Sequence, residues 1–273
     1  MELIFYGVRG TYPVPERDKI GYGGDTLCTG IQTKGGMVIV DAGTGIRKIG
    51  RNRPGEKIQV QGEWHILFTH FHLDHIMGLP FFPPLYSSDA LIHFHSPVSA
   101  EEMHYYFSGL MHERYFPIEY DETPSWKMYS QNPKEPFSIL NATVSACSLH
   151  HPQGSVAYRV QAEGKTVILS TDTEHPEKGI DERLAEFANQ ADDFIYDAMY
   201  TPQEYDNGKK GWGHSTWLEG TRLANASKVS RLFLSHYNPL HSDNQISRFI
   251  EEARKEFTPT FGAKESDLKE NEK

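Results

Sequence analysis

The chain of 273 residues has little cysteine, no long apolar run and no surplus of positive charge, and each shortage excludes a class of protein. Two cysteines, Cys28 and Cys147, are too few for a disulfide scaffold or a zinc finger, and we expect both to be buried and inert. No uncharged apolar stretch approaches the roughly 20 residues that a bilayer-spanning helix needs. The first ten residues also lack the pattern of a secretory signal. We therefore expect a cytoplasmic protein with no membrane partner.

The charge balance is acidic, with 27 Lys and Arg against 37 Asp and Glu and a formal net charge of −10. Proteins that grip a long nucleic acid usually carry a basic surface. The balance therefore predicts that bulk nucleic acid is not a partner, while a small phosphorylated substrate stays open. A hydrophobic fraction of 38% and a charged fraction of 23% are typical of a globular protein with a substantial core.

Short β-type runs recur along the chain and alternate later with helical periodicity. Glycine-containing turns at 35–36 and 163–165 predict hairpins, so part of the sheet structure is expected to be antiparallel. Strands in two sets, followed by helices, indicate a four-layer αββα sandwich in which helices flank two packed mixed sheets. The expected strands are 3–8, 29–33, 37–41, 65–69, 91–95, 143–149, 155–160, 166–171, 194–197 and 231–235, and the expected helices are 180–190, 216–226 and 243–257.

We predict a single domain over residues 1–261 and a flexible tail over 262–273, which carries many charges and little to bury. The stretch 97–136, rich in Tyr, Phe, Met, Glu and Pro, is expected to be an insertion that lies over the site, with weak helical signal at 99–110. Its aromatic side chains either stack on a substrate base or belong to the core or to a homodimer interface. These side chains are Tyr105, Tyr106, Phe107, Tyr115 and Phe116.

Fourteen histidines are present, and the densest group directly follows the expected strand 65–69. It comprises His70, His72, Asp74 and His75. Residues two apart on an extended chain share a face, so His70 and His72 point the same way, and the turn that follows directs Asp74 and His75 to a second centre. The pattern predicts two metal ions close together. The alternative, a solvated polar loop, seldom reaches this density of histidine.

Three later strands also end in a histidine or an aspartate. His150 and His151 follow 143–149, Asp172 follows 166–171, and His236 follows 231–235. A single histidine at a strand end is usually a hydrogen-bonded surface residue, but three such ends beside the dense group predict one ring of ligands. The residues alone leave His150 and His151 as alternatives for one position. Imidazole nitrogen and carboxylate oxygen suit zinc, and manganese would accept them too.

The His-x-His-x-Asp-His motif at 70–75 resembles that of the metallo-β-lactamase fold superfamily of hydrolases. The segments 7–11, 23–26 and 41–43 resemble its ribonuclease Z-like phosphodiesterase branch, and the likeness runs from about residue 3 to about residue 257. It implies the αββα sandwich with a dinuclear site, normally zinc. It also favours His151 over His150, because the adjoining proline is part of the family pattern.

The resemblance further implies which side chain serves which ion. Two divalent cations, two carboxylates and one hydroxide sum to about +1, a charge that suits a monoanionic phosphodiester. We expect Asp74 to belong to the catalytic residues as well as to the ligands. One ion is assigned to His70, His72 and His151, the other to Asp74, His75 and His236, with Asp172 shared between them.

A departing alkoxide also needs a proton. The segment 212–216 resembles the His-Ser-Thr motif of that branch and places His214 at the start of a helix. Asp197 stands where those relatives carry Glu, which shortens the reach by one methylene. We expect Asp197 to pair with His214 and to raise its pKa, so that the ring can protonate the leaving oxygen. A helix-capping or surface role is the alternative for His214.

The sequence therefore predicts a metal-dependent hydrolase of a small phosphodiester. The stretches 211–216 and 115–117 resemble bacterial and phage proteins of this branch that open cyclic nucleotides, which favours a 3′,5′-cyclic nucleotide as substrate. The alternatives are a ribonuclease Z-like RNA 3′-end endonuclease, a hydrolase of another cyclic phosphate, and a metal-binding module without turnover. The acidic balance and the lack of a Gly/Pro/Lys-rich insertion argue against transfer-RNA processing.

Overall fold

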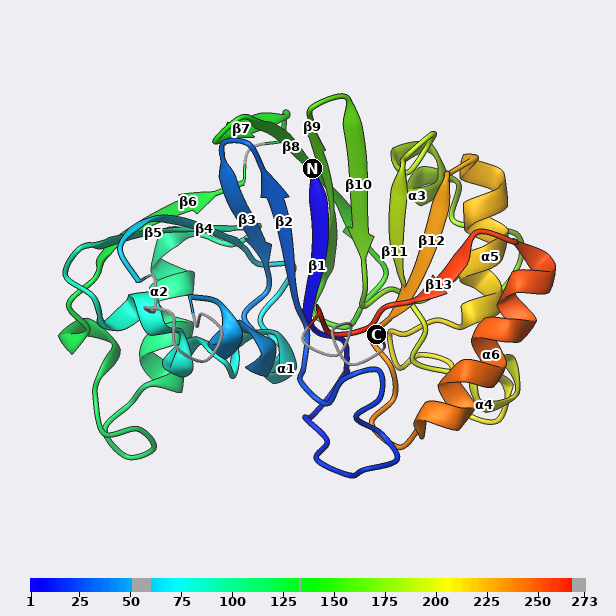
Figure 1. The fold of residues 1–273 in the computed structure, drawn as a ribbon, viewed down its shortest axis with the longest axis horizontal. Helices are drawn as coiled ribbons and strands as arrows, with labels where there is room; N and C mark the ends of the chain where they lie inside the picture. Colours follow the sequence, from blue (N-terminus) through cyan, green and yellow to red (C-terminus); the bar gives the residue numbers. More distant parts are fainter. Residues whose placement is uncertain (51–59, 133, 267–273) are drawn as a thin grey trace, which may run out of the picture.

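The computed structural model describes residues 1–50, 60–132 and 134–266. Two mixed β-sheets pack face to face, and helices cover the outer side of each sheet (Figure 1). The αββα sandwich expected from the sequence is confirmed. Within the described ranges, no helix has the length and apolar character needed to cross a membrane.

The first sheet is antiparallel over its first three strands and parallel from the third strand to the sixth. Its strands follow one another in sequence order from edge to edge. They are β1 (Glu2–Gly7), β2 (Cys28–Thr33), β3 (Gly36–Val40), β4 (Gly62–Leu67), β5 (Ala90–Ser96) and β6 (Trp126–Gln131).

The second sheet repeats this plan, because its early strands are antiparallel and its later strands parallel. The carboxyl ends of the parallel strands in both sheets therefore become available for a shared site. The strands are β7 (Phe137–Ile139), β8 (Ala142–Leu149), β9 (Ser155–Ala162), β10 (Lys165–Ser170), β11 (Asp193–Asp197), β12 (Arg231–Ser235) and β13 (Thr260–Gly262).

The helices from α2 onward begin after residues whose side chains accept from the first free backbone N–H groups. Ser99 accepts from the N–H of Glu102, and Ser242 accepts from that of Gln245, each within a reciprocal capping box. The α-helices are α1 (Leu73–Ile76), α2 (Ala100–Leu110), α3 (Glu182–Phe187), α4 (Pro202–Asp206), α5 (Trp217–Ser227) and α6 (Asp243–Glu256). Short 3₁₀ helices are η1 (Thr44–Lys48), η2 (Leu79–Phe81), η3 (Pro83–Tyr86) and η4 (Tyr120–Glu122).

Alternation along the strands divides the core into two main layers. Val38 and Val40 of β3 point inward and join the cluster shared by both sheets, whereas Ile39 between them faces outward. The outward layer packs beneath α2, which contributes Met103 and Phe107. The aromatic stretch around 97–136 thus supplies core, α2 and strand β6, while Tyr105 and Tyr115, named above as possible base-stacking residues, are exposed. Its role as a lid stays a prediction.

Three strands were not predicted, and the expected strand 65–69 ends earlier. β6 lies at an edge and exposes its apolar Trp126 and Met128, so its alternation does not mark a buried face, while β7 and β13 have only three residues each. The chain leaves β4 after Leu67 because the N–H of Thr69 donates to the side chain of Asp41 at 2.8 Å instead of to a strand.

The expected tail begins too early. Glu265 is buried, its side chain accepts from the N–H of Asp25 at 2.8 Å, and it forms an ion pair with Lys48. Ala263 is also buried. A charged residue can be fixed when a partner from a distant segment is present, which composition cannot reveal. The remainder of the expected tail, 267–273, lies outside the described residues.

Arg9 ties the segment after β1 to the segment before α6. The guanidinium is fully buried and donates to the carbonyl oxygens of Gly23 and His241, each at 2.9 Å, and it also contacts Asn238 and Asp243. Arginine suits this place because its planar group carries five donors in a fixed arrangement.

We predict that Arg9→Met lowers the free energy of unfolding by about 3 kcal/mol, because several buried carbonyls lose a charged donor. Urea denaturation followed by circular dichroism measures the loss. The control is Arg222→Met, which removes a half-exposed guanidinium paired with Glu219 and should cost at most about 0.5 kcal/mol. Equal losses in the two variants would contradict the structural role given to Arg9.

Candidate metal centre

The seven predicted ligands lie together at one end of the sandwich, in the seam between the two sheets. Four come from the segment after β4 and from α1 itself, and three come from strand ends of the second sheet. They are His70, His72, Asp74 and His75 from the first group, and His151, Asp172 and His236 from the second.

The backbone aims these side chains through an uncommon conformation. Asp172 and His236, which follow β10 and β12, have φ values of +58° and +60°, and Asp41 after β3 has +61°. Left-handed backbone at residues other than glycine costs about 1–3 kcal/mol and tends to occur at functional sites. Each strand here therefore ends in a turn that redirects one carboxylate or imidazole toward the seam.

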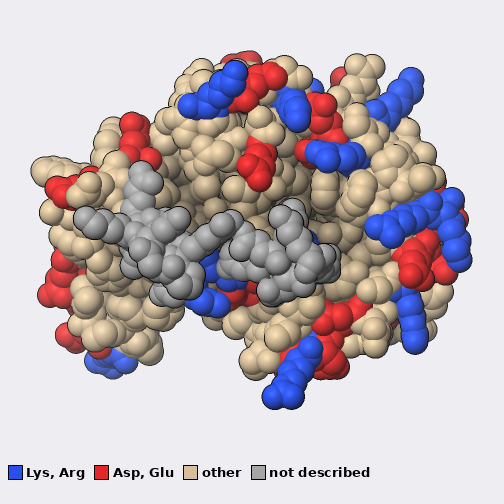
Figure 2. Space-filling model, in the orientation of Figure 1, with Lys and Arg blue, Asp and Glu red and all other residues tan. Residues whose placement is uncertain are grey.

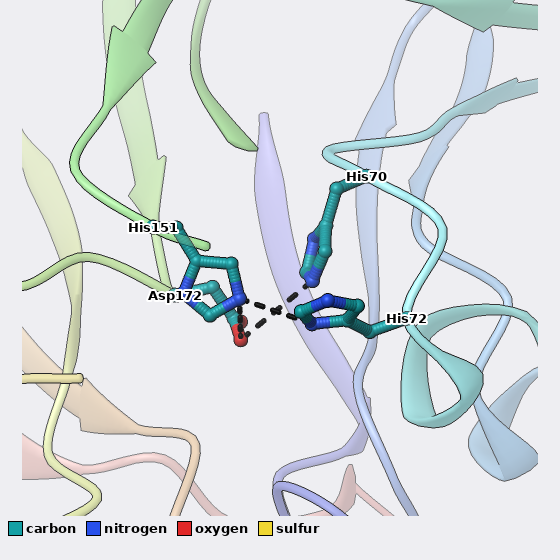
Figure 3. Close-up of side chains that lie close together, drawn as sticks. All are labelled: His70, His72, His151 and Asp172. Carbon is teal, nitrogen blue, oxygen red and sulfur yellow. Dashed lines mark hydrogen bonds and ion pairs between the residues drawn. The ribbon is translucent and has the colours of Figure 1, made fainter. Parts of the chain in front are cut away.

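The first group of donor atoms is formed by His70, His72, His151 and Asp172, which approach one another from opposite sides in Figure 3. Nε2 of His151 lies 3.0 Å from Nδ1 of His72. Oδ1 of Asp172 lies 3.6 Å from Nε2 of His151 and 3.8 Å from Nε2 of His70. These separations leave a common point that all four donors face.

A second group faces the other oxygen of the same aspartate. Oδ2 of Asp172 lies 3.0 Å from Nε2 of His75 and 3.2 Å from Nε2 of His236. Oδ2 of Asp74 lies 3.3 Å from Nε2 of His236. The two oxygens of Asp172 thus serve two adjacent groups, which is the geometry of a bridging carboxylate.

Four of the donor atoms fit metal ions particularly well, because they are buried and lack hydrogen bonds to the described residues. Nε2 of His70, His75 and His236 and Oδ2 of Asp172 have no hydrogen-bond partner within the described part of the chain. An unpaired buried polar atom costs free energy, and a cation facing all of them would remove that cost. The mixture of imidazole nitrogen and carboxylate oxygen suits divalent cations of the zinc type.

Outer partners hold the rings so that the correct nitrogen faces inward. Nδ1 of His151 donates to the carbonyl of Gly213 at 2.7 Å, and Nδ1 of His75 donates to Asp41 at 2.8 Å. Nε2 of His72 donates to the side-chain oxygen of Gln153 at 3.0 Å. Such partners fix the tautomer and the orientation of metal-binding histidines.

The electrostatic environment differs between the two ligand groups, so the pKa of His70 and that of His75 shift in opposite directions. Burial lowers the pKa of His70 and of His151, which favours the neutral imidazole that a metal ion requires. Burial alone would do the same at His75, but the carboxylates of Asp172 and Asp41 outweigh it and hold the pKa of His75 well above its usual value. The negative charge of these carboxylates therefore stabilises a positive charge that lies between His75 and Asp172.

His214 lies beside the ligands and is held by Asp197, as predicted from the sequence. Nδ1 of His214 is 3.0 Å from Oδ2 of Asp197, and the ring is close to that of His236, with ring centroids 5.0 Å apart. Burial lowers the pKa of His214, but the adjacent Asp197 and the carboxylates of Asp172 and Asp74 together raise it to about 9. The ring can therefore carry a proton at neutral pH.

Asp197 does more than the sequence indicated. The fully buried carboxylate also accepts from the backbone N–H of Asp172 at 2.9 Å, of Met199 at 3.0 Å and of Ser215 at 3.1 Å. One side chain therefore connects the bridging ligand to the loop that carries His214. Only its position at the end of a buried strand marks this role in the sequence.

Two residues of the 7–11 segment also shape the centre, and only the family likeness pointed to that segment. The N–H of Thr11 donates to Oδ2 of Asp74 at 2.6 Å. Gly10 lies against the ring of His236, because a Cβ at this position would come within 2.5 Å of it. Any side chain at Gly10 would therefore displace that ring.

The structure distinguishes between the two adjacent histidines, His150 and His151, that the sequence offers for one ligand position. His151 lies in the ligand group, whereas His150 is exposed and lines a neighbouring pocket of about 440 Å³. The pocket opens directly beside the predicted ligands, so a substrate held at the centre would extend into it. Its lining consists of His150, His151, Pro152, Glu174, His175, Pro176, Glu177, Gly211 and Gly213.

Comparison with known proteins extends these observations. The family described as Beta-lactamase superfamily domain matches residues 37–237. A ribonuclease Z of Thermoplasma acidophilum is 22% identical over an alignment of 315 positions, which covers 97% of this chain and 94% of the relative. The expected resemblance to the ribonuclease Z branch is confirmed.

Solved structures show the same fold at low identity. A metallo-beta-lactamase fold protein of Bacillus subtilis has a TM-score of 0.71 and 19% identity, covering 96% of this chain and 95% of its own. The short form of human tRNase Z has a TM-score of 0.62 and 19% identity, covering 87% and 93%. Likenesses at this level of identity establish the fold.

The prediction that bulk nucleic acid is not a partner is wrong, because curated relatives matching nearly the whole chain are ribonucleases. Net charge sums over the entire surface, whereas a phosphodiester backbone responds to the field close to the site. On the face shown in Figure 2, the described Lys and Arg residues are interspersed with Asp and Glu. An acidic total is therefore a poor guide to local binding.

We predict that Asp41→Asn lowers the affinity for zinc about 10- to 100-fold, because the buried carboxylate that orients His75 loses its charge. Asparagine tolerates left-handed backbone, so the fold should persist. Competition with a chromophoric chelator measures the affinity. Asp89→Asn, which changes an exposed carboxylate, is the control and should bind as the unchanged protein does. Equal affinity in both variants would exclude the orienting role.

Proposed function

Because the chain belongs to the β-lactamase superfamily, we propose that it is a metal-dependent phosphodiesterase that cuts RNA at a 3′ end, in the manner of a ribonuclease Z. The coarser statement, that the chain is a metal-dependent hydrolase acting on phosphodiesters, holds whatever the substrate is. The observation that supports it most is the bridging position of Asp172 between two groups of ligands, beside the His214–Asp197 pair.

The ligand set suits two divalent cations, and zinc is the ion proposed. One ion would be held by the group around His70 and the other by the group around His75, with one oxygen of Asp172 directed to each. Bound there, such cations polarise phosphoryl oxygens and lower the pKa of water, which supplies a nucleophile at neutral pH.

The residues of the chain orient the remaining chemistry. Asp197 engages Nδ1 of His214, which leaves Nε2 as the ring atom available to a leaving oxygen. We propose that His214 donates the proton that the departing alkoxide needs, and that Asp197 keeps the ring charged beforehand. Oδ2 of Asp74 accepts the N–H of Thr11, and this bond holds the same oxygen toward His236 in the ligand group. Asp74 is therefore proposed as a metal ligand with a direct part in the reaction.

RNA is favoured as the substrate because the curated relatives that match nearly the whole chain are named ribonuclease Z. The centre lies where two sheets meet and its pocket is open, so a long chain can thread past the ligands without being enclosed. A homodimer stays a prediction.

A cyclic nucleotide is the second candidate, and the pocket beside the centre is the observation that favours it. About 440 Å³ is enough room for a small ligand of nucleotide size. His175, whose Nδ1 is 2.8 Å from the hydroxyl of Ser215, would contact such a ligand next to the catalytic loop.

We predict that the zinc-loaded protein cleaves a transfer RNA with a 3′ trailer at least about 100-fold more efficiently than 3′,5′-cyclic AMP or GMP, measured as kcat/KM. Gel analysis of the RNA and chromatography of the nucleotides give both rates from one preparation. Asp172→Ala should abolish every activity and so controls for contaminating nucleases. Efficient opening of the cyclic nucleotides with intact RNA would support the second candidate instead.

We predict that His214→Ala lowers kcat about 10²- to 10³-fold on RNA, because an alkoxide leaves poorly without a proton. On bis(p-nitrophenyl) phosphate the loss should be less than about tenfold, since nitrophenolate leaves unaided. Zinc content is measured in parallel to show that the ligands are intact. Equal losses on the two substrates would mean that His214 positions the centre and does not act as the acid.

A further inference from the structure

A second group of metal-binding side chains lies away from the catalytic centre. It consists of Glu63 and His65 on β4 and His93 on β5, whose donor atoms all lie within 4.8 Å of one another. His95 lies next to it on β5. Glu63 and His65 lie within β4 and His93 within β5, whereas the predicted catalytic ligands follow strand ends, and the two groups share no residue.

Strand register brings these side chains to one face. β4 and β5 are parallel, and His65 pairs directly with His93. Glu63 lies two residues before His65, and His95 two residues after His93, so all four point the same way. Leu67 on this face reaches the core between the sheets, while Glu63 at the beginning of the strand is exposed. The group therefore lies where the inner face meets solvent.

One carboxylate oxygen faces two imidazole nitrogens. Oε1 of Glu63 lies 3.1 Å from Nε2 of His65 and 2.9 Å from Nε2 of His93. The second contact lacks hydrogen-bond geometry, and Nε2 of His93 is buried without a hydrogen-bond partner in the described part of the chain. The nitrogen is thus close to the oxygen but not aimed at it. A cation among these three donor atoms, which all lie within 4.8 Å of one another, would give the unpaired nitrogen of His93 a partner.

His95 supports the ring of His65 from the other side. Nδ1 of His65 lies 3.3 Å from Nε2 of His95, and the two rings are 18° from parallel. The rings of His65 and His93 stack with centroids 4.4 Å apart and 11° between their planes. Nδ1 of His65 is therefore occupied by its contact with His95, which holds Nε2 toward Glu63. Histidines in metal sites are commonly oriented by such a partner on the second nitrogen.

We propose that Glu63, His65 and His93 form a third metal site, which takes a divalent transition-metal ion with one coordination position open to solvent. Zinc is the probe of choice, because it accepts two imidazoles and a carboxylate with water as the fourth ligand. With three protein ligands and an exposed carboxylate, the site is expected to bind more weakly than the catalytic centre. A bound ion would fasten β4 to β5 beside the edge strand β6.

The test compares metal content and does not depend on the proposed function. The unchanged protein, Glu63→Gln and His93→Ala are dialysed against excess zinc and counted by mass spectrometry, with circular dichroism to verify the fold. Each variant should bind one equivalent fewer than the unchanged protein. His104→Ala is the matched control: it removes a more exposed histidine that contacts Asp121 and should leave the count unchanged.

The rate on bis(p-nitrophenyl) phosphate should stay within about twofold in Glu63→Gln, because no catalytic ligand is altered. Zinc should also raise the melting temperature of the unchanged protein above that of Glu63→Gln. Should His93→Ala fail to fold, Glu63→Gln decides alone, because it keeps the shape of an exposed side chain. A zinc count in Glu63→Gln equal to that of the unchanged protein, with equal melting temperatures, would overturn the third site.

Discussion

The structure depends on a buried seam between the two sheets, in which several side-chain nitrogen and oxygen atoms without hydrogen-bond partners among the described residues face one another. Burying polar atoms without partners is costly, and two strand ends, at Asp172 and His236, adopt left-handed backbone to aim such atoms. A cation that faces all of these atoms offsets both costs at once. The αββα sandwich supports this arrangement because the parallel halves of its two sheets deliver their carboxyl ends to the same place. Around that seam lie the pocket beside His151, the loop that carries His214, and the buried carboxylate of Asp197.

Much of the centre could be predicted from the sequence because its ligands follow simple rules of spacing and strand ends. The alternation at His70 and His72 and the polar ends of β10 and β12 are local signals. The contact of Asp197 with Asp172 and the burial of Glu265 were not predictable, because each depends on partners far along the chain. β7 and β13 were missed because three residues show no period, and β6 because its apolar side chains face solvent at a sheet edge. The acidic net charge led to the wrong prediction that bulk nucleic acid is not a partner, because a total charge carries no information on where the charges lie.

The two histidine groups use similar donors in different settings. At the catalytic centre the donors come from loops and helix starts of both sheets, and no water-exposed carboxylate is among them. At the outer group they come from two neighbouring strands, and the carboxylate of Glu63 is half exposed. The first setting surrounds a reacting group from several directions. The second can only fasten two strands that are already paired, which is why a structural ion is the occupant proposed there.

The division of the catalytic ligands between two stretches of chain bears on how the protein matures. Four ligands precede residue 76, and the other three follow residue 150. A nascent chain on the ribosome therefore has half of the coordination sphere long before it has the rest. Capture of the proposed ions would then be a late step of biogenesis, completed only after the second sheet has docked on the first. In a cell short of the ion, chains would accumulate with both sheets formed but without the metal link between them.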